Sequence, residues 1–114
     1  MKKVFLITAV IIFLFSLTAF SHPPADIEMA FELENNILEA SVTHRSQNNQ
    51  DHFVEKVEIF LNDELMIKQD FLIQSNNDQQ NLLYLMPGVV EGDTIKIIAY
   101  CNQFGSLEEE MLIE

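Results

Sequence analysis

Residues 94–101 read TIKIIAYC, and residues 102–105, which follow, read NQFG. Side chains two apart in a β-strand point the same way, so Ile97, Ala99 and Cys101 share one face of an extended run. The Asn-x-x-Gly segment then turns the chain. The only cysteine is therefore expected at the end of a strand, with its sulfur directed inward beside the loops.

The same alternation recurs from Ala25 onward, with turn residues about every 8–12 positions and no convincing helical period. In one expected strand, Phe53 and Val57 are assigned to the inward face. About seven short strands without helices are typical of an all-β protein folded as an antiparallel β-sandwich. The expected strands are residues 27–31, 38–44, 53–61, 65–73, 81–86, 94–101 and 107–113.

Residues 1–21 have the anatomy of a secretory signal peptide. Met1-Lys2-Lys3 is positively charged, residues 4–15 are almost entirely apolar, and Ala19-Phe20-Ser21 offers a small-x-small cleavage site before His22. Cleavage after Ala19 is the competing site, and an uncleaved segment would be the protein's one link to a membrane. We therefore expect a single domain, residues 22–114, in the periplasm or secreted.

The domain is strongly acidic. Residues 22–114 contain all 18 acidic residues and only four basic ones, a formal charge of −14. Such a surface repels nucleic acid and anionic membranes, so nucleic acid is excluded as a partner. A single cysteine cannot form an internal disulfide, and an exported domain of this size must rely on its core, or on its core and a metal.

Four soft or borderline metal ligands occur: His22, His44, His52 and Cys101. His44 and His52 bracket one polar loop, so both belong to the same end of the sheet. Imidazoles with one thiolate suit iron, copper or zinc, and do not suit calcium or magnesium. The alternative stays open that Cys101 is a buried apolar residue and that the histidines are ordinary terminal, strand-end and loop residues.

Three segments resemble the desulfoferrodoxin / superoxide reductase family. His44, a polar loop and His52-Phe53-Val54-Glu55-Lys56-Val57-Glu58-Ile59 resemble its His-Pro…Glu-His-Tyr-Ile-x-x-Ile segment. Residues 100–105, YCNQFG, resemble its Cys-Asn-x-His-Gly motif, and His22-Pro23-Pro24…Ile27 is similar to its His-Val-Pro-x-Ile segment. The resemblance spans residues 22–114, with the three segments in the family's order.

The resemblance implies an immunoglobulin-like, seven-stranded sandwich with a mononuclear non-haem iron (Fe2+/Fe3+) that reduces superoxide to peroxide. In this chain His22, His44 and His52 match three equatorial histidines, and Cys101 matches the axial thiolate. Phe104 stands where the family has its fourth histidine. That difference and the acidic surface, which repels an anionic substrate, predict impaired superoxide reduction.

The sequence thus favours an exported, iron-binding, redox-type protein, which would be a superoxide reductase-like oxidoreductase if it turns over. Such a protein requires an electron donor, which the sequence does not identify. The sequence is also compatible with a homodimer. Copper or zinc held by the same ligands for delivery is the first alternative, and a metal-free interaction sandwich is the second. If His22 becomes the mature N-terminus, its amine and imidazole could also chelate copper together.

Overall fold

The computed structural model describes residues 22–114; the predicted signal peptide and its cleavage site lie outside these residues. Seven strands form, and all pairings between them are antiparallel. The prediction of an all-β sandwich is confirmed. The strands are β1 (Asp26–Glu32), β2 (Ile37–Thr43), β3 (Val54–Leu61), β4 (Glu64–Asp70), β5 (Gln79–Leu85), β6 (Thr94–Cys101) and β7 (Ser106–Leu112).

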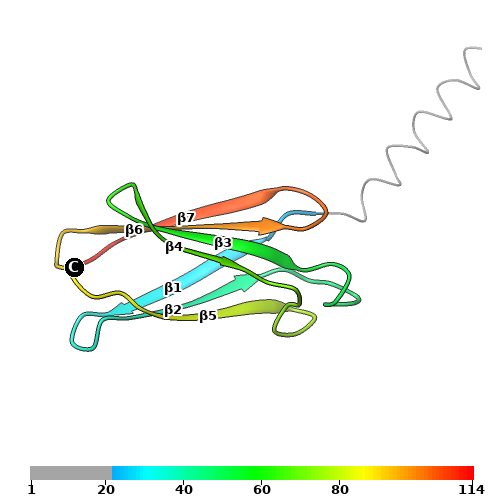
Figure 1. Ribbon diagram of the computed structural model, residues 1–114, viewed down its shortest axis with the longest axis horizontal. Helices are drawn as coiled ribbons and strands as arrows, with labels where there is room; N and C mark the ends of the chain where they lie inside the picture. Colours follow the sequence, from blue (N-terminus) through cyan, green and yellow to red (C-terminus); the bar gives the residue numbers. More distant parts are fainter. Residues whose placement is uncertain (1–21) are drawn as a thin grey trace, which may run out of the picture.

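The strands form two layers (Figure 1). One sheet has three strands in the order β1-β2-β5, and the other has four in the order β4-β3-β6-β7. This is an immunoglobulin-like strand order in which β4 pairs with β3 rather than with β5. None of the described residues belongs to a helix long and apolar enough to cross a membrane.

The core lies between the two inner faces, as the period-2 pattern requires. Strand β6 shows this most plainly, because its residues alternate between buried and half-buried along its whole length. Ile97 of β6 pairs with Ile59 of β3, and both are fully buried, as are Leu38 and Val42 of β2. Apolar burial of this kind must hold the domain, because its one cysteine is free.

One inward assignment is wrong. Phe53 lies outside β3 and is only half-buried, whereas Val54 is fully buried. The register between β3 and β6 shifts between Val54 and Lys56, so Glu55 is an extra residue on β3. Such a bulge reverses the side-chain parity on one side of itself. A period-2 count backward from Val57 therefore reaches Phe53 instead of Val54.

At one end of the sandwich, four chain segments meet: the start of β1, the end of β2, the start of β3 and the end of β6 (Figure 1). The loops that cover this end are residues 44–53, 71–78 and 102–105. The register fixes the arrangement, since Val54 at the start of β3 pairs with Cys101 at the end of β6. All four predicted ligands lie at or beside these strand ends.

Candidate metal centre

Strand ends position three of the predicted ligands. His44 follows the last residue of β2, His52 precedes β3, and Cys101 is the last residue of β6. One ligand atom from each of the three lies within 4.8 Å of the other two. Two donors bound to one metal, each at about 2.0–2.3 Å, lie at most about 4.6 Å apart. The three side chains therefore need little movement to share an ion.

Within this group, the closest pair is His52 Nε2 and Cys101 Sγ, which lie 3.1 Å apart. The rings of His44 and His52 lie edge to face, with their centroids 4.6 Å apart. His44 is fully buried, Cys101 is 6% exposed and His52 is half-buried. The group is thus nearly enclosed by protein on one side and reachable from solvent on the side of His52.

His22 lies beside this group rather than fully within it. Its ring centroid is 5.2 Å from that of His44 and 5.2 Å from that of His52. Its Nδ1 lies 3.1 Å from the Pro23 carbonyl oxygen, and its own carbonyl oxygen lies 3.3 Å from His44 Nε2. His22 therefore offers two donors at this end of the sandwich, an imidazole and a carbonyl oxygen.

The turn after β6 fixes the sulfur. The Cys101 N–H donates to the Gly105 carbonyl (2.9 Å), and the Gln103 N–H approaches the Cys101 sulfur at 3.4 Å. Asn102 ties this turn to Phe53, accepting the Phe53 N–H at its Oδ1 (2.9 Å) and donating its own N–H to the Phe53 carbonyl (3.0 Å). N–H groups directed at a thiolate sulfur stabilise its charge and tune a bound metal.

A buried glutamine lies behind His44. Gln74, which is 1% exposed, accepts hydrogen bonds at Oε1 from His44 Nδ1 (2.8 Å) and from the Val54 N–H (3.0 Å). Its Nε2 donates to the carbonyls of His44 (2.7 Å) and Asn76 (2.9 Å). Its backbone binds Asn49 in the loop between the two histidines. Gln74 thus joins the loops that carry the ligands.

Burial lowers the pKa of His52 below its ordinary value, and positive charge on His44 or His22 lowers it further. A like charge nearby disfavours the protonated form of His52. His52 is consequently neutral over a wider pH range than an exposed histidine. The neutral imidazole is the form that binds a metal.

A hollow of about 610 Å³ opens beside the ligands, and Arg45, Asp51 and Asp78 provide its charges. Two carboxylates against one guanidinium leave it with a negative formal balance, which favours the approach of cations over that of anions. His22, His52 and Gln103 line the same hollow. The candidate metal centre is therefore reachable from solvent through a hollow with a negative formal charge.

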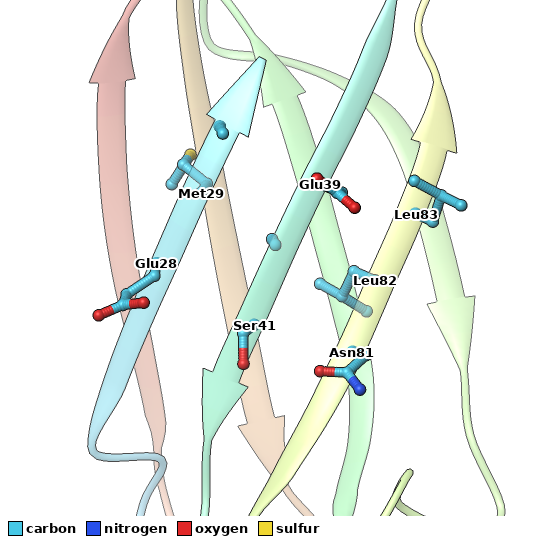
Figure 2. A pocket seen from close by; sticks show the side chains of 9 residues that line it. Glu28, Met29, Glu39, Ser41, Asn81, Leu82 and Leu83 are labelled. Atoms are coloured by element: carbon cyan, nitrogen blue, oxygen red, sulfur yellow. The ribbon is translucent and has the colours of Figure 1, made fainter. Parts of the chain in front are cut away.

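A second hollow, of about 630 Å³, lies on the outer face of the three-stranded sheet (Figure 2). The small side chains of Ala30 and Ser41 leave it open between Glu28, Glu39 and Leu83. It contains no histidine or cysteine, so it is a shallow surface feature and not part of the metal centre.

The structure brings together His44, His52 and Cys101, as expected from strand parity and from the loop that His44 and His52 share. It places His22 next to them, a position that only the family resemblance had suggested. Phe104 is 60% exposed and supplies no donor atom. Gln74 was missed, because a glutamine in the polar segment after β4 carries no sequence signal of burial. Comparisons with family models, curated proteins and solved structures gave no match to this chain.

Proposed function

We propose that the chain is an exported mononuclear iron-binding protein of the superoxide-reductase type. Its ligands are His22, His44, His52 and Cys101. The observation that carries the proposal is the clustering of His44, His52 and Cys101, with their ligand atoms within 4.8 Å of one another. Nitrogen and thiolate donors in this combination fit iron, copper and zinc.

The chemistry of the donors supports a redox role. An iron ion would supply one-electron transfer, and a thiolate ligand directs electron density onto the metal. The Gln103 N–H near the sulfur draws some of that density back, and so adjusts the potential. The acidic balance of the hollow beside His52 disfavours an anionic substrate, so superoxide reduction is expected to be slow.

Two acceptor atoms that face each other give the proposal independent support. His44 Nδ1 lies 2.8 Å from Gln74 Oε1 and donates its hydrogen there, which leaves a lone pair on Nε2 when the ring is neutral. That Nε2 lies 3.3 Å from the His22 carbonyl oxygen, which also bears lone pairs. Two acceptors at this separation are stabilised by a proton or a metal ion between them.

A copper carrier or copper electron-transfer protein is the second candidate. The tightest group consists of two imidazoles and one thiolate, the donor set of trigonal copper sites that have a weak axial oxygen or sulfur. The His22 carbonyl oxygen is on hand for that axial role. A zinc carrier would use three imidazoles and the thiolate in a tetrahedron.

Elemental analysis of protein purified from its export compartment distinguishes these functions. About one iron per chain supports the main proposal, whereas copper or zinc at that ratio supports a carrier. The visible spectrum of the oxidised protein then tests the thiolate, because a sulfur-to-metal charge-transfer band should vanish in Cys101→Ser. A spectrum and metal content that survive this substitution would exclude Cys101 as a ligand. Protein that binds none of the three metals would be an interaction sandwich.

A further inference from the structure

We infer that Gln74 is a positioning residue, which fixes the hydrogen of His44 on Nδ1 and so presents Nε2 as the metal-binding atom. The inference rests on the proposed metal site and assigns a role to a residue that contributes no ligand. It follows from three hydrogen bonds of the Gln74 amide to backbone groups, whose directions are fixed, and from a fourth to His44.

The orientation of the Gln74 amide follows from its backbone partners. The carbonyls of His44 and Asn76 can only accept, so the NH₂ group must face them, at 2.7 and 2.9 Å. The Val54 N–H can only donate, so the carbonyl oxygen of Gln74 must face it, at 3.0 Å. Turning the amide over would oppose donor to donor and acceptor to acceptor in a fully buried place.

The orientation of the amide then decides the state of His44. An amide oxygen cannot donate, so His44 Nδ1, which lies 2.8 Å from Gln74 Oε1, must carry the hydrogen. In a neutral ring this leaves the lone pair on Nε2, which lies 3.3 Å from the His22 carbonyl oxygen. Histidines that bind metals commonly donate their second ring nitrogen's hydrogen to an acceptor in this way, which orients the ring.

Gln74 also restrains the loop between His44 and His52. Its N–H donates to the Asn49 carbonyl (3.1 Å), and Asn49 Nδ2 donates to the Gln74 carbonyl (2.8 Å). A variant of Gln74 keeps these backbone bonds, because they do not involve its side chain. The ring-orienting contribution of the amide can therefore be separated from the support of the loop.

The first measurement uses metal-free protein, so it does not depend on the proposed function. At about pH 8, where histidines with an ordinary pKa near 6.5 are neutral, ¹H–¹⁵N NMR of the imidazoles should show the hydrogen of His44 on Nδ1. In Gln74→Leu the hydrogen should become distributed between both nitrogens or move to Nε2. His44 predominantly in the Nε2–H form in the wild-type protein would overturn the inference.

The second measurement is the dissociation constant for Co²⁺, read from its visible absorption. Gln74→Leu removes the acceptor, and we expect binding to weaken by about 10–100-fold, with shifted bands. Gln74→Glu keeps an acceptor oxygen for His44 Nδ1 but loses both donors, so it should lower stability and yet bind Co²⁺ within about threefold of wild type. A purely structural role for Gln74 predicts that Gln74→Glu loses as much affinity as Gln74→Leu.

Gln80 offers a matched control. It is 5% exposed, accepts the Ser75 N–H at its Oε1 (3.2 Å) and donates to the Asn81 carbonyl (2.9 Å), and neither hydrogen bond involves a histidine. Gln80→Leu should cost stability and leave Co²⁺ affinity unchanged. If Gln74→Leu does not fold, Gln74→Asn, which withdraws the acceptor by one methylene, replaces it.

The outcomes separate the two proposals. Wild-type protein that binds no metal refutes the proposed function, while the NMR result still tests the role of Gln74. If Gln74→Leu, or Gln74→Asn in its place, binds Co²⁺ as tightly as the wild-type protein does, the inference about Gln74 is refuted and the proposed function is not.

Discussion

At the scale of single residues, the carboxylate of Asp93 joins two loops of this acidic chain by hydrogen bonds. Its Oδ1 accepts from Asn62 Nδ2 and its Oδ2 accepts from the Val90 N–H, both at 2.9 Å. The Asn62 side chain also accepts a hydrogen bond from the N–H of Thr94, the residue that follows Asp93. The bond from Asn62 and then the bond from Val90 lower the pKa of Asp93 below its ordinary 3.8.

A group with a lowered pKa in the folded state stabilises the fold above its unfolded pKa, and this stabilisation is lost as the pH falls through the folded pKa. Asp93→Asn should therefore have a lower urea midpoint than wild type at pH 7. The two midpoints should draw together as the pH falls through the lowered pKa of Asp93, because the carboxylate is then protonated. A gap that stays constant between these pH values would contradict the assignment to charge.

The sequence allowed three candidate ligands to be placed, His44 and Cys101 by strand parity and His52 by the loop that it shares with His44. The sequence did not reveal the role of Gln74, because only the tertiary fold brings the loop after β4 against His44. Val54 was missed for a related reason. A bulge changes the side-chain parity locally, and no residue type marks its position.

At the scale of elements, the turn after β6 supports the N-terminal segment. A Cβ at Gly105 would lie 2.9 Å from Pro23 Cβ, and Gly105 has a φ of +75°. Gly105→Ala should therefore displace the segment that carries His22 and weaken metal binding. Because an L-residue in this conformation costs roughly 1–2 kcal/mol, its stability should fall as well, as thermal unfolding and metal titration would show.

Gly88→Ala is the control for backbone strain alone. Gly88 has a φ of +88°, but a Cβ there would meet nothing within 4 Å. It should lose a similar conformational free energy and keep its metal affinity. Equal metal affinities in the two alanine variants would show that Pro23 does not position His22.

Strand β6 should be the most sensitive element of the core. Ile97 is fully buried and pairs with the fully buried Ile59. Ile97→Ala should lower the free energy of unfolding by about 2–5 kcal/mol through lost burial and a cavity. Ile98→Ala, on the half-buried outer face of the same strand, should cost about 1 kcal/mol. Urea denaturation measures both, and similar losses would contradict the assignment of the faces.

The elements themselves were predicted well, because period-2 alternation and turn residues agree along the whole domain. The sequence indicates an extended run over residues 65–73 with a break near Asp70, and in the structure β4 ends at Asp70. Its continuation leaves the sheet and leads to Gln74. Sequence pattern indicates where a strand can form, but the need to cover the end of the sandwich decides where this one stops.

At the scale of the whole molecule, the lysines are confined to one sheet. β1 and β2 carry acidic residues, β5 carries no charge, and none of the three has a basic residue. All three lysines of the domain lie in β3, β4 and β6, in the sheet that also holds the acidic residues of β3, β4 and β7. The exposed Leu83 and Leu85 lie on the uncharged β5. The positions of the strands could be predicted from alternation, but the assignment of each strand to one of the two sheets could not, because strands of both sheets alternate with the same period.

Metal binding should stabilise the whole domain, since the ligands come from both sheets and from the N-terminal segment. An ion present at 100 times its dissociation constant adds about 2.7 kcal/mol, which should raise the melting temperature by roughly 10–20 °C. Chelation should reverse the increase. The double variant His44→Ala/Cys101→Ser should show no such shift, and a shift that persists in it would place the ion elsewhere.

The pairing of His52 with Cys101 also sets the order of events during maturation. These residues are 49 positions apart, so their encounter requires β3 and β6 to be already paired. Closure of the intervening chain is offset mainly by pairing of the strands. An ion held by the proposed ligands would therefore bind late in folding, and its release would require opening of the covering loops rather than global unfolding.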